Sequence, residues 1–148
     1  MFPNAKGSEL LAILAAIDPA SQAAGTVSTG WISVANHHSL LAVLQTGVLG
    51  TAATVDAKLQ QALDATGTSA KDITGKAITQ IVKASGDNKQ VLINARPEEL
   101  DTVNGFGFVR LSVTVGTAAS IVAAQMLGVN PRELPAHTGN QSAVAQIL

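Results

Sequence analysis

The amino-acid sequence predicts an all-β protein, a β-sandwich with an extended arm at each end. Apolar and polar residues alternate along several short segments, which is the period of a strand with one buried and one solvated face. Turn-forming residues separate these segments at a spacing typical of sandwiches and barrels. Charged residues make up only 13% of the chain, against about 25% in soluble domains. We therefore expect other chains to cover part of the surface.

A chain of 148 residues is most simply one domain. We expect an N-terminal arm over residues 1–9, the sandwich over residues 10–128 and a C-terminal arm over residues 129–148. The first element is the apolar run Leu10–Ile17, which fits a strand or a helix and which Pro19 should end. The run is too short for a membrane span and lacks the features of a signal peptide. We therefore expect synthesis in a cytoplasm and no membrane partner.

The next segments are predicted to be strands. Val27–Asn36 and Leu40–Leu44 come first. The second of these is continuously apolar, which predicts a strand covered on both faces, either by Leu10–Ile17 or by a neighbouring subunit. Thr54–Gln60 has an apolar residue at every second position, which predicts one dry face and one wet face.

The later segments complete the predicted sandwich. Val91–Ile93 is a short apolar strand, and Phe108–Val115 alternates aliphatic with polar residues. Ser120–Leu127 fits a strand or an Ala-rich helix. We favour a strand, because Gly116–Ala119 is typical of a hairpin connection. Between these elements, Pro97–Leu100 should form a short helical turn, since proline suits the first helical position and acidic residues favour the N-terminal end.

The composition excludes several kinds of chemistry. Cysteine is absent, which excludes disulfides and thiolate ligands. The net charge is −1 and no basic stripe occurs, so we expect no nucleic-acid partner. The glycines near Lys76 and Phe106 fit neither a phosphate-binding loop nor a dinucleotide-binding turn. The densest acids, Glu98, Glu99 and Asp101, are explained by the helical turn. We expect no catalytic site, no cofactor and no metal.

Two groups of side chains remain as candidates for contacts. His37 and His38 are adjacent, so in a strand they would face opposite ways and would not readily share an ion. A polar turn before the next strand explains this pair. Trp31 falls on the opposite face from Ile32 and Val34. If these two are core residues, Trp31 points outward and needs a partner or an arm to cover it. The alternative is a strand buried on both faces.

A further signal comes from seven runs, namely Gly30–Asn36, Leu41–Gly47, Thr54–Ala62, Asp64–Ile73, Ala77–Gln80, Arg96–Asp101 and Phe108–Val115. In residues and spacing, from about Ala15 to Gly128, the chain resembles a group of small tailed-phage head proteins, some of which are jelly-roll cement (decoration) proteins. Such proteins are usually encoded near the major capsid protein. The resemblance implies a jelly-roll topology and a trimer on the outside of the phage head. It implies no cofactor and no reaction.

The resemblance and the low charge lead to one functional hypothesis. The chain would be a structural virion protein that bridges major capsid protein subunits, because binding only the assembled shell stabilises that shell. The alternative is a neck, tail or fibre adaptor, or a receptor-binding β-sandwich module. The expected partners are the major capsid protein and further copies of the chain, as a homotrimer. The candidate interface residues are Phe2, Pro3, Trp31, His37, His38, Pro131, Arg132, Pro135 and His137.

Overall fold

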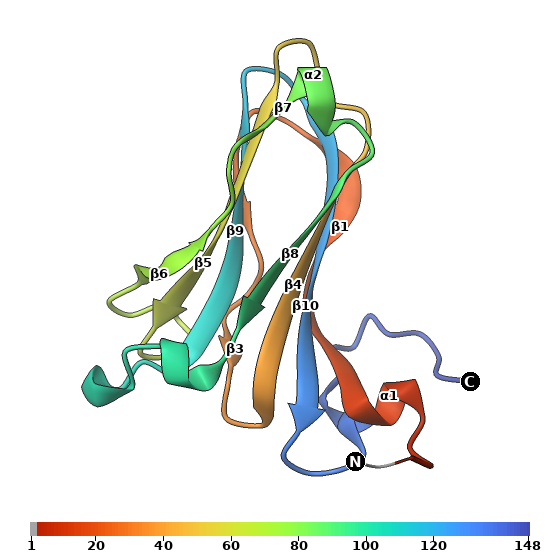
Figure 1. The fold of residues 1–148 in the computed structure, drawn as a ribbon, viewed down its shortest axis with the longest axis vertical. Coiled ribbons are helices and arrows are strands. Elements are labelled where there is room, and N and C mark those ends of the chain that lie inside the picture. The colour runs from red at the N-terminus through yellow and green to blue at the C-terminus, as the bar shows by residue number, and fades with distance from the viewer. Residues whose placement is uncertain (1–2) are drawn as a thin grey trace.

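The computed structural model describes residues 3–148, apart from the side chains of residues 137 and 138. Its strands form two antiparallel sheets that face each other (Figure 1). Sheet A contains, in spatial order, β1 (Leu11–Gln22), β10 (Ser120–Pro131), β4 (His37–Thr46) and β8 (Gln90–Ala95). Sheet B contains β2 (Gly25–Ser28), β9 (Phe108–Gly116), β5 (Thr54–Ala62) and β6 (Lys71–Ala77), with β3 (Ile32–Ser33) beside β9 and β7 (Ile81–Val82) beside β5.

The strand order is that of a jelly roll. The chain crosses repeatedly between the sheets, from β1 to β2, from β4 to β5, and again from β8 to β9 and back to β10. The last strand, β10, returns to lie between β1 and β4, which is the Greek-key arrangement. The predicted β-sandwich of jelly-roll type is therefore confirmed.

The core lies between the sheets and is mainly aliphatic. β5 and β9 alternate as predicted, with every second side chain directed inward and fully buried. The largest fully buried hydrophobic side chains are Leu40, Leu44, Leu49, Leu59, Leu111, Met126, Val55, Val109, Val113, Val115 and Val122. Because these come from both sheets, the sandwich is held together by apolar burial across its whole interior.

The first strand corrects the expectation that Pro19 ends the first element. β1 continues through Pro19 to Gln22, and its register with β10 shifts between Ile17 and Ala20. Proline is tolerated at such an irregularity and on an edge strand, where its missing N–H removes no ladder hydrogen bond. Most of the run Leu10–Ile17 is therefore an edge strand of the same sheet as β4, and it does not lie over β4.

Two further expectations about connections are wrong. Gly116–Ala119 is not a hairpin connection, because β9 and β10 belong to different sheets and the chain crosses between them here. Thr117 makes this crossing in the left-handed region, with φ at 69°. The pair His37 and His38 does not form a polar turn, because β4 already begins at His37. Ser120–Leu127 is a strand, as favoured.

Short helices and turns occupy the connections. The helices are α1 (Gly7–Leu10), α2 (Lys83–Gly86), η1 (Pro97–Glu99), η2 (Thr102–Asn104) and η3 (Ala136–Gly139). The helical turn expected from Pro97 is present as η1, where the backbone N–H of Arg96 donates to Oε2 of Glu99 at 2.8 Å. In the β5–β6 turn, hydrogen bonds from Thr66 and Thr68 to the Asp64 carboxylate lower the pKa of Asp64.

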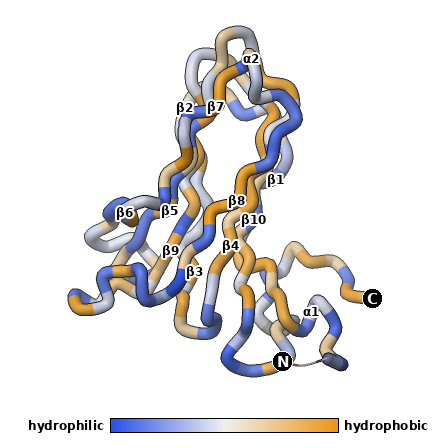
Figure 2. Tube along the Cα trace, viewed as in Figure 1, coloured by the Kyte–Doolittle hydropathy of each residue, from blue (hydrophilic) through white to orange (hydrophobic). Residues whose placement is uncertain are grey.

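The helix α1 and the C-terminal segment lie at the same end of the molecule (Figure 1). β10 extends to Pro131, so residues 129–131 still belong to sheet A. The chain then turns back to the first strand. The N–H of Ile13 donates to Oδ1 of Asn140 at 2.6 Å, and the N–H of Gln141 donates to the carbonyl of Ile13 at 2.9 Å. We call residues 140–148 the C-terminal tail; apolar residues predominate at its tip (Figure 2).

Within residues 3–148, no helix has the length and apolar character that a membrane crossing requires.

Candidate interaction surface

The outer face of sheet A is the most unusual surface of the molecule. In each strand of this sheet, inward residues are buried in the core, and the residues between them point outward. Among the described residues, the outward side chains over most of this face are uncharged. We call this set the uncharged face. It consists of Leu11, Ile13, Ala16, Ser39, Leu41, Val43, Gln45, Gln90, Leu92, Asn94, Ile121, Ala123, Gln125, Leu127 and Val129.

The strand register arranges these side chains in rows across the sheet. One row joins Ala16, Gln125, Val43 and Leu92, each opposite the next on the neighbouring strand. Opposed side chains in antiparallel strands are close enough to pack together. Leu92 is 61% exposed and Ile121 is 45% exposed. The face is therefore a continuous surface of aliphatic and amide groups, the composition expected for the centre of an interface.

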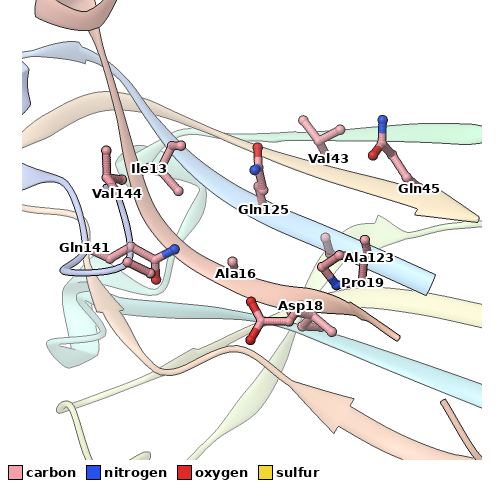
Figure 3. Close-up of a pocket in the computed structure, with 13 residues that line it drawn as sticks. Ile13, Ala16, Asp18, Pro19, Val43, Gln45, Ala123, Gln125, Gln141 and Val144 are labelled. Atoms are coloured by element: carbon pink, nitrogen blue, oxygen red, sulfur yellow. The ribbon is translucent and has the colours of Figure 1, made fainter. Parts of the chain in front are cut away.

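The C-terminal tail borders this face and leaves a groove beside it. The groove has a volume of about 430 Å³ and lies between the tail and the outward side chains of β1, β10 and β4. Figure 3 shows Val43, Gln45 and Gln125 on one side of the groove, with Val144 and Gln141 of the tail at one end. Asp18 is the charged residue among its lining side chains.

The outer face of sheet B differs in chemistry, because charged groups link its strands. Lys58 Nζ and Gln60 Nε2 each donate to the Asp72 carboxylate at 2.8 Å, which joins β5 to β6 and lowers the pKa of Asp72. Arg110 Nε donates to Gln60 Oε1 at 3.0 Å, which joins β9 to β5. Exposed pairs of this kind add little stability. They keep this face hydrated, so the sandwich has one charged and one uncharged outer face.

Trp31 lies on the charged side and is covered by its own chain. The Arg110 guanidinium carbon is 4.5 Å from the centre of the indole ring, a cation–π contact. The β5–β6 turn packs on the same side chain, because a Cβ added to Gly67 would lie 2.5 Å from Trp31 Nε1. Val34 is buried in the core and Ile32 packs against it. The cover that we expected from a partner or an arm thus comes from Arg110 and Gly67.

The structure brings four of the candidate interface residues together. His37, Pro131, Arg132 and Pro135 line a pocket of about 300 Å³ at the end of sheet A, beside η3. The imidazole ring of His37 lies against Gly128, where a Cβ would come within 2.5 Å of the ring. Thus β4, β10 and the segment after β10 meet at this histidine.

His37 is 4% exposed, and its Nδ1 has no hydrogen-bond partner among the described residues. Burial lowers the pKa of His37. Burial therefore favours the neutral form of this ring, because the charged form loses more hydration.

The remaining candidates lie elsewhere. His38 is exposed while His37 is buried, so the two rings do not converge. Pro3 is exposed in a turn near the N-terminus. Phe2 lies outside the described residues, and His137 belongs to η3 with its side chain outside them. Over the described residues, no three His, Asp or Glu side chains are grouped as metal ligands would be.

Sequence reasoning missed most of the uncharged face. The apolar outer side of Leu40–Leu44 gave a partial signal. Leu41 and Val43 confirm it, because both are half-buried members of the uncharged face. The second signal was the absence of charge between Ser120 and Val129. Neither signal shows a shared face until the pairing of β10 with β4 is known.

Comparisons with known proteins give only distant similarities. No protein-family model matches the sequence, and no curated protein sequence matches it. A chain of the naturally occurring empty particles of cowpea mosaic virus is similar over 88% of this chain and 92% of its own length, with 10% identity and a TM-score of 0.42. A family 22 carbohydrate-binding module of Clostridium thermocellum Xyn10B is similar over 87% and 90%, with 14% identity and a TM-score of 0.40. A chain of Bacillus endospore appendages is similar over 85% and 96%, with 13% identity and a TM-score of 0.34.

Proposed function

We propose that this chain is a structural protein of a phage virion that cements the head by bridging major capsid protein subunits on its outer surface. The observation that carries the proposal is the division of the sandwich into an uncharged and a charged outer face. A bridging protein needs one surface that loses its water against a partner and another that stays in water. The sequence resemblance to phage head proteins supplies the identity of the partner.

The uncharged face suits a docked surface energetically. Burying its aliphatic side chains contributes about 25 cal/mol per Å² of apolar area. A charged side chain in the same place would lose its hydration and offset that gain. The amide groups of Gln45, Gln90 and Gln125 can donate and accept hydrogen bonds, so they can fix the orientation of the partner without burying charge.

The proposal includes a homotrimer, no catalytic activity and no bound cofactor. The resemblance to cement proteins supports the trimer, and the lack of a catalytic pattern in the sequence supports a purely structural role. Stabilisation would arise by mass action, because a protein that binds the assembled shell and not its free subunits lowers the free energy of the shell.

The proposal is tested by adding the purified protein to heads that lack it and heating them. We expect the wild-type protein to co-sediment with the heads and to raise the temperature at which they rupture. Gln125→Lys places a charge at an exposed position of the uncharged face, so it should leave the fold intact. We expect its affinity for heads to fall on the order of tenfold or more, the effect of burying an unpaired charge.

The matched control is Thr74→Lys, which adds the same charge at an exposed position of β6 in sheet B. We expect this variant to bind and stabilise heads as the wild type does. Equal rupture temperatures with and without the protein would contradict cementing. Equal loss of binding in both variants would contradict the assignment to the uncharged face.

A further inference from the structure

The two sheets present four edges, formed mainly by β1, β8, β2 and β6, and within residues 3–148 three of them carry protection against pairing with another chain. β1 contains Pro19 and two register irregularities, and the C-terminal tail hydrogen-bonds to it at Ile13. β2 is short, with four residues. β6 carries Lys71, Asp72 and Lys76. Proline, bulges, short length and charge are the devices that keep sheet edges from joining.

β8 lacks these devices. Its sequence from Gln90 to Ala95 contains no charged residue and no proline, and it pairs with β4 in an unbroken register. Its exposed hydrophobic side chain, Leu92, is 61% exposed. Along its other side, no strand of the described chain pairs with it. An apolar, regular and open edge of this kind is a template for another strand.

The ladder with β4 determines which backbone groups of β8 remain open. The N–H of Thr46 donates to the carbonyl of Lys89 at 2.8 Å, and these two residues are opposed in the register that joins the strands. Hydrogen-bonded and non-hydrogen-bonded pairs alternate along an antiparallel ladder. Val91 and Ile93 therefore direct their backbone groups toward β4. Gln90, Leu92 and Asn94 direct their N–H and C=O groups away from it.

We propose that β8 pairs with β8 of a second copy in antiparallel orientation, across a two-fold axis at Leu92, so that two A sheets become one continuous sheet. In this register Leu92 lies opposite Leu92 of the second copy, and Gln90 lies opposite its Asn94. The outward amides meet each other, and the inward Val91 and Ile93 also meet. The sequence of β8 is therefore complementary to itself, which is the requirement for a two-fold interface and the reason to assign the occupant as a second copy.

The contact extends the uncharged face across both copies. It uses the backbone edge of β8, whereas the proposed head binding uses the outward side chains of the sheet. A pairing of two six-residue strands buries less area than stable dimers need, so it is weak for free copies. It strengthens when copies are held close together on one surface. Because each copy contributes one edge, the contact is compatible with a trimer built through other surfaces.

Cysteine cross-linking of the isolated protein tests the register directly, since the chain contains no cysteine of its own. In the proposed register the Cα atoms of the opposed Leu92 residues lie about 5.5 Å apart, within the range that a disulfide spans. We expect Leu92→Cys to form disulfide dimers under mild oxidation. Gln90→Cys alone and Asn94→Cys alone should form no disulfide dimer, because each residue lies roughly 14 Å from the equivalent residue of the second copy. An equal mixture of the two variants should cross-link.

The matched control is Val103→Cys, a 95% exposed position of η2 outside the sheets. We expect Leu92→Cys to cross-link on the order of tenfold faster than this control, because pairing holds its thiols together. Equal rates would overturn the proposal, and so would cross-linking of Gln90→Cys alone. The experiment contains no capsid protein, so its failure leaves the head-binding proposal standing, and loss of head binding leaves this result standing.

A second variant separates backbone pairing from side-chain contact. Leu92→Pro removes an N–H that points away from β4, so the strand keeps its ladder with β4. We expect the wild-type protein to self-associate in sedimentation as its concentration rises. We expect the Leu92→Pro variant to keep the wild-type melting temperature and to lose this self-association. Unchanged self-association in a folded Leu92→Pro variant would overturn the proposal.

Discussion

The ionisation of His37 is coupled to the fold through its burial. The unfolded chain takes up a proton on this histidine near its ordinary pKa of about 6.5, whereas burial lowers the pKa in the folded protein. The unfolded state therefore binds more protons below that pH, and stability falls as the pH drops through it. Above the ordinary pKa of histidine, the contribution of His37 to the free energy of unfolding is fully present.

We predict that His37→Phe removes this acid-sensitive component. The wild-type free energy of unfolding should decrease between about pH 7 and pH 5, and the variant should show a smaller decrease. Urea unfolding at each pH measures the difference. His38→Gln, at an exposed neighbouring position, is the control and should keep the wild-type profile. The account of His37 fails if both variants keep the same slope.

Gly128 makes room for the same ring. We predict that Gly128→Ala destabilises the protein by about 1–3 kcal/mol, the usual cost of overpacking, because the new Cβ would lie within 2.5 Å of the imidazole. Gly107→Ala is the control, since no atom lies within 4 Å of a Cβ at that position. Thermal or urea unfolding measures both variants. A neutral Gly128→Ala would show that the ring has space to move aside.

At the scale of elements, the C-terminal tail is held to β1 by Asn140. We predict that Asn140→Ala leaves the N–H of Ile13 without its acceptor and costs about 1 kcal/mol. Amide hydrogen exchange at Ile13 should become faster, while exchange in β5 and β9 at low denaturant should change little. Gln146→Ala, exposed in the same tail, is the control. Unchanged protection of Ile13 in Asn140→Ala would contradict this attachment.

The sequence predicted some elements well, and the reason is physical. Thr54–Gln60 and Phe108–Val115 lie in the middle of sheet B, with one face in the core and one in water, so their alternation is complete. Pro19 gave a wrong end for the first element, because a proline ends a helix or a central strand and nothing in the sequence shows that β1 is an edge. Gly116–Ala119 gave a wrong connection, because a short connection fits a hairpin and a crossing between sheets equally well.

The candidate surface was less predictable than the fold. The outward residues of β10 and β4 are far apart in sequence, and they form one face only through the pairing of Gln125 with Val43 and its neighbours. Trp31 was expected to point outward, but its contact with Arg110 depends on the placement of β9. Periodicity gives the face of a residue within a strand, whereas the neighbours across strands require the topology.

At the scale of the whole molecule, two faces of unlike chemistry are joined by one aliphatic core. The charged face keeps the protein hydrated, and the uncharged face and the open β8 edge are available to other chains. This arrangement accounts for the low overall charge, because the residues that would normally solvate sheet A are replaced by aliphatic and amide groups. It also supports an assembled protein more than one that works alone.

The central claim is that this chain covers the heads of a phage as a structural component. Quantitative mass spectrometry of purified virions, with the major capsid protein as the reference, tests this claim most directly. We predict a ratio on the order of one chain per capsid subunit, as mass-action coverage of a repeating surface requires. A handful of copies per virion would contradict the cement role and favour a neck, tail or fibre position, and absence from virions would contradict a structural role altogether.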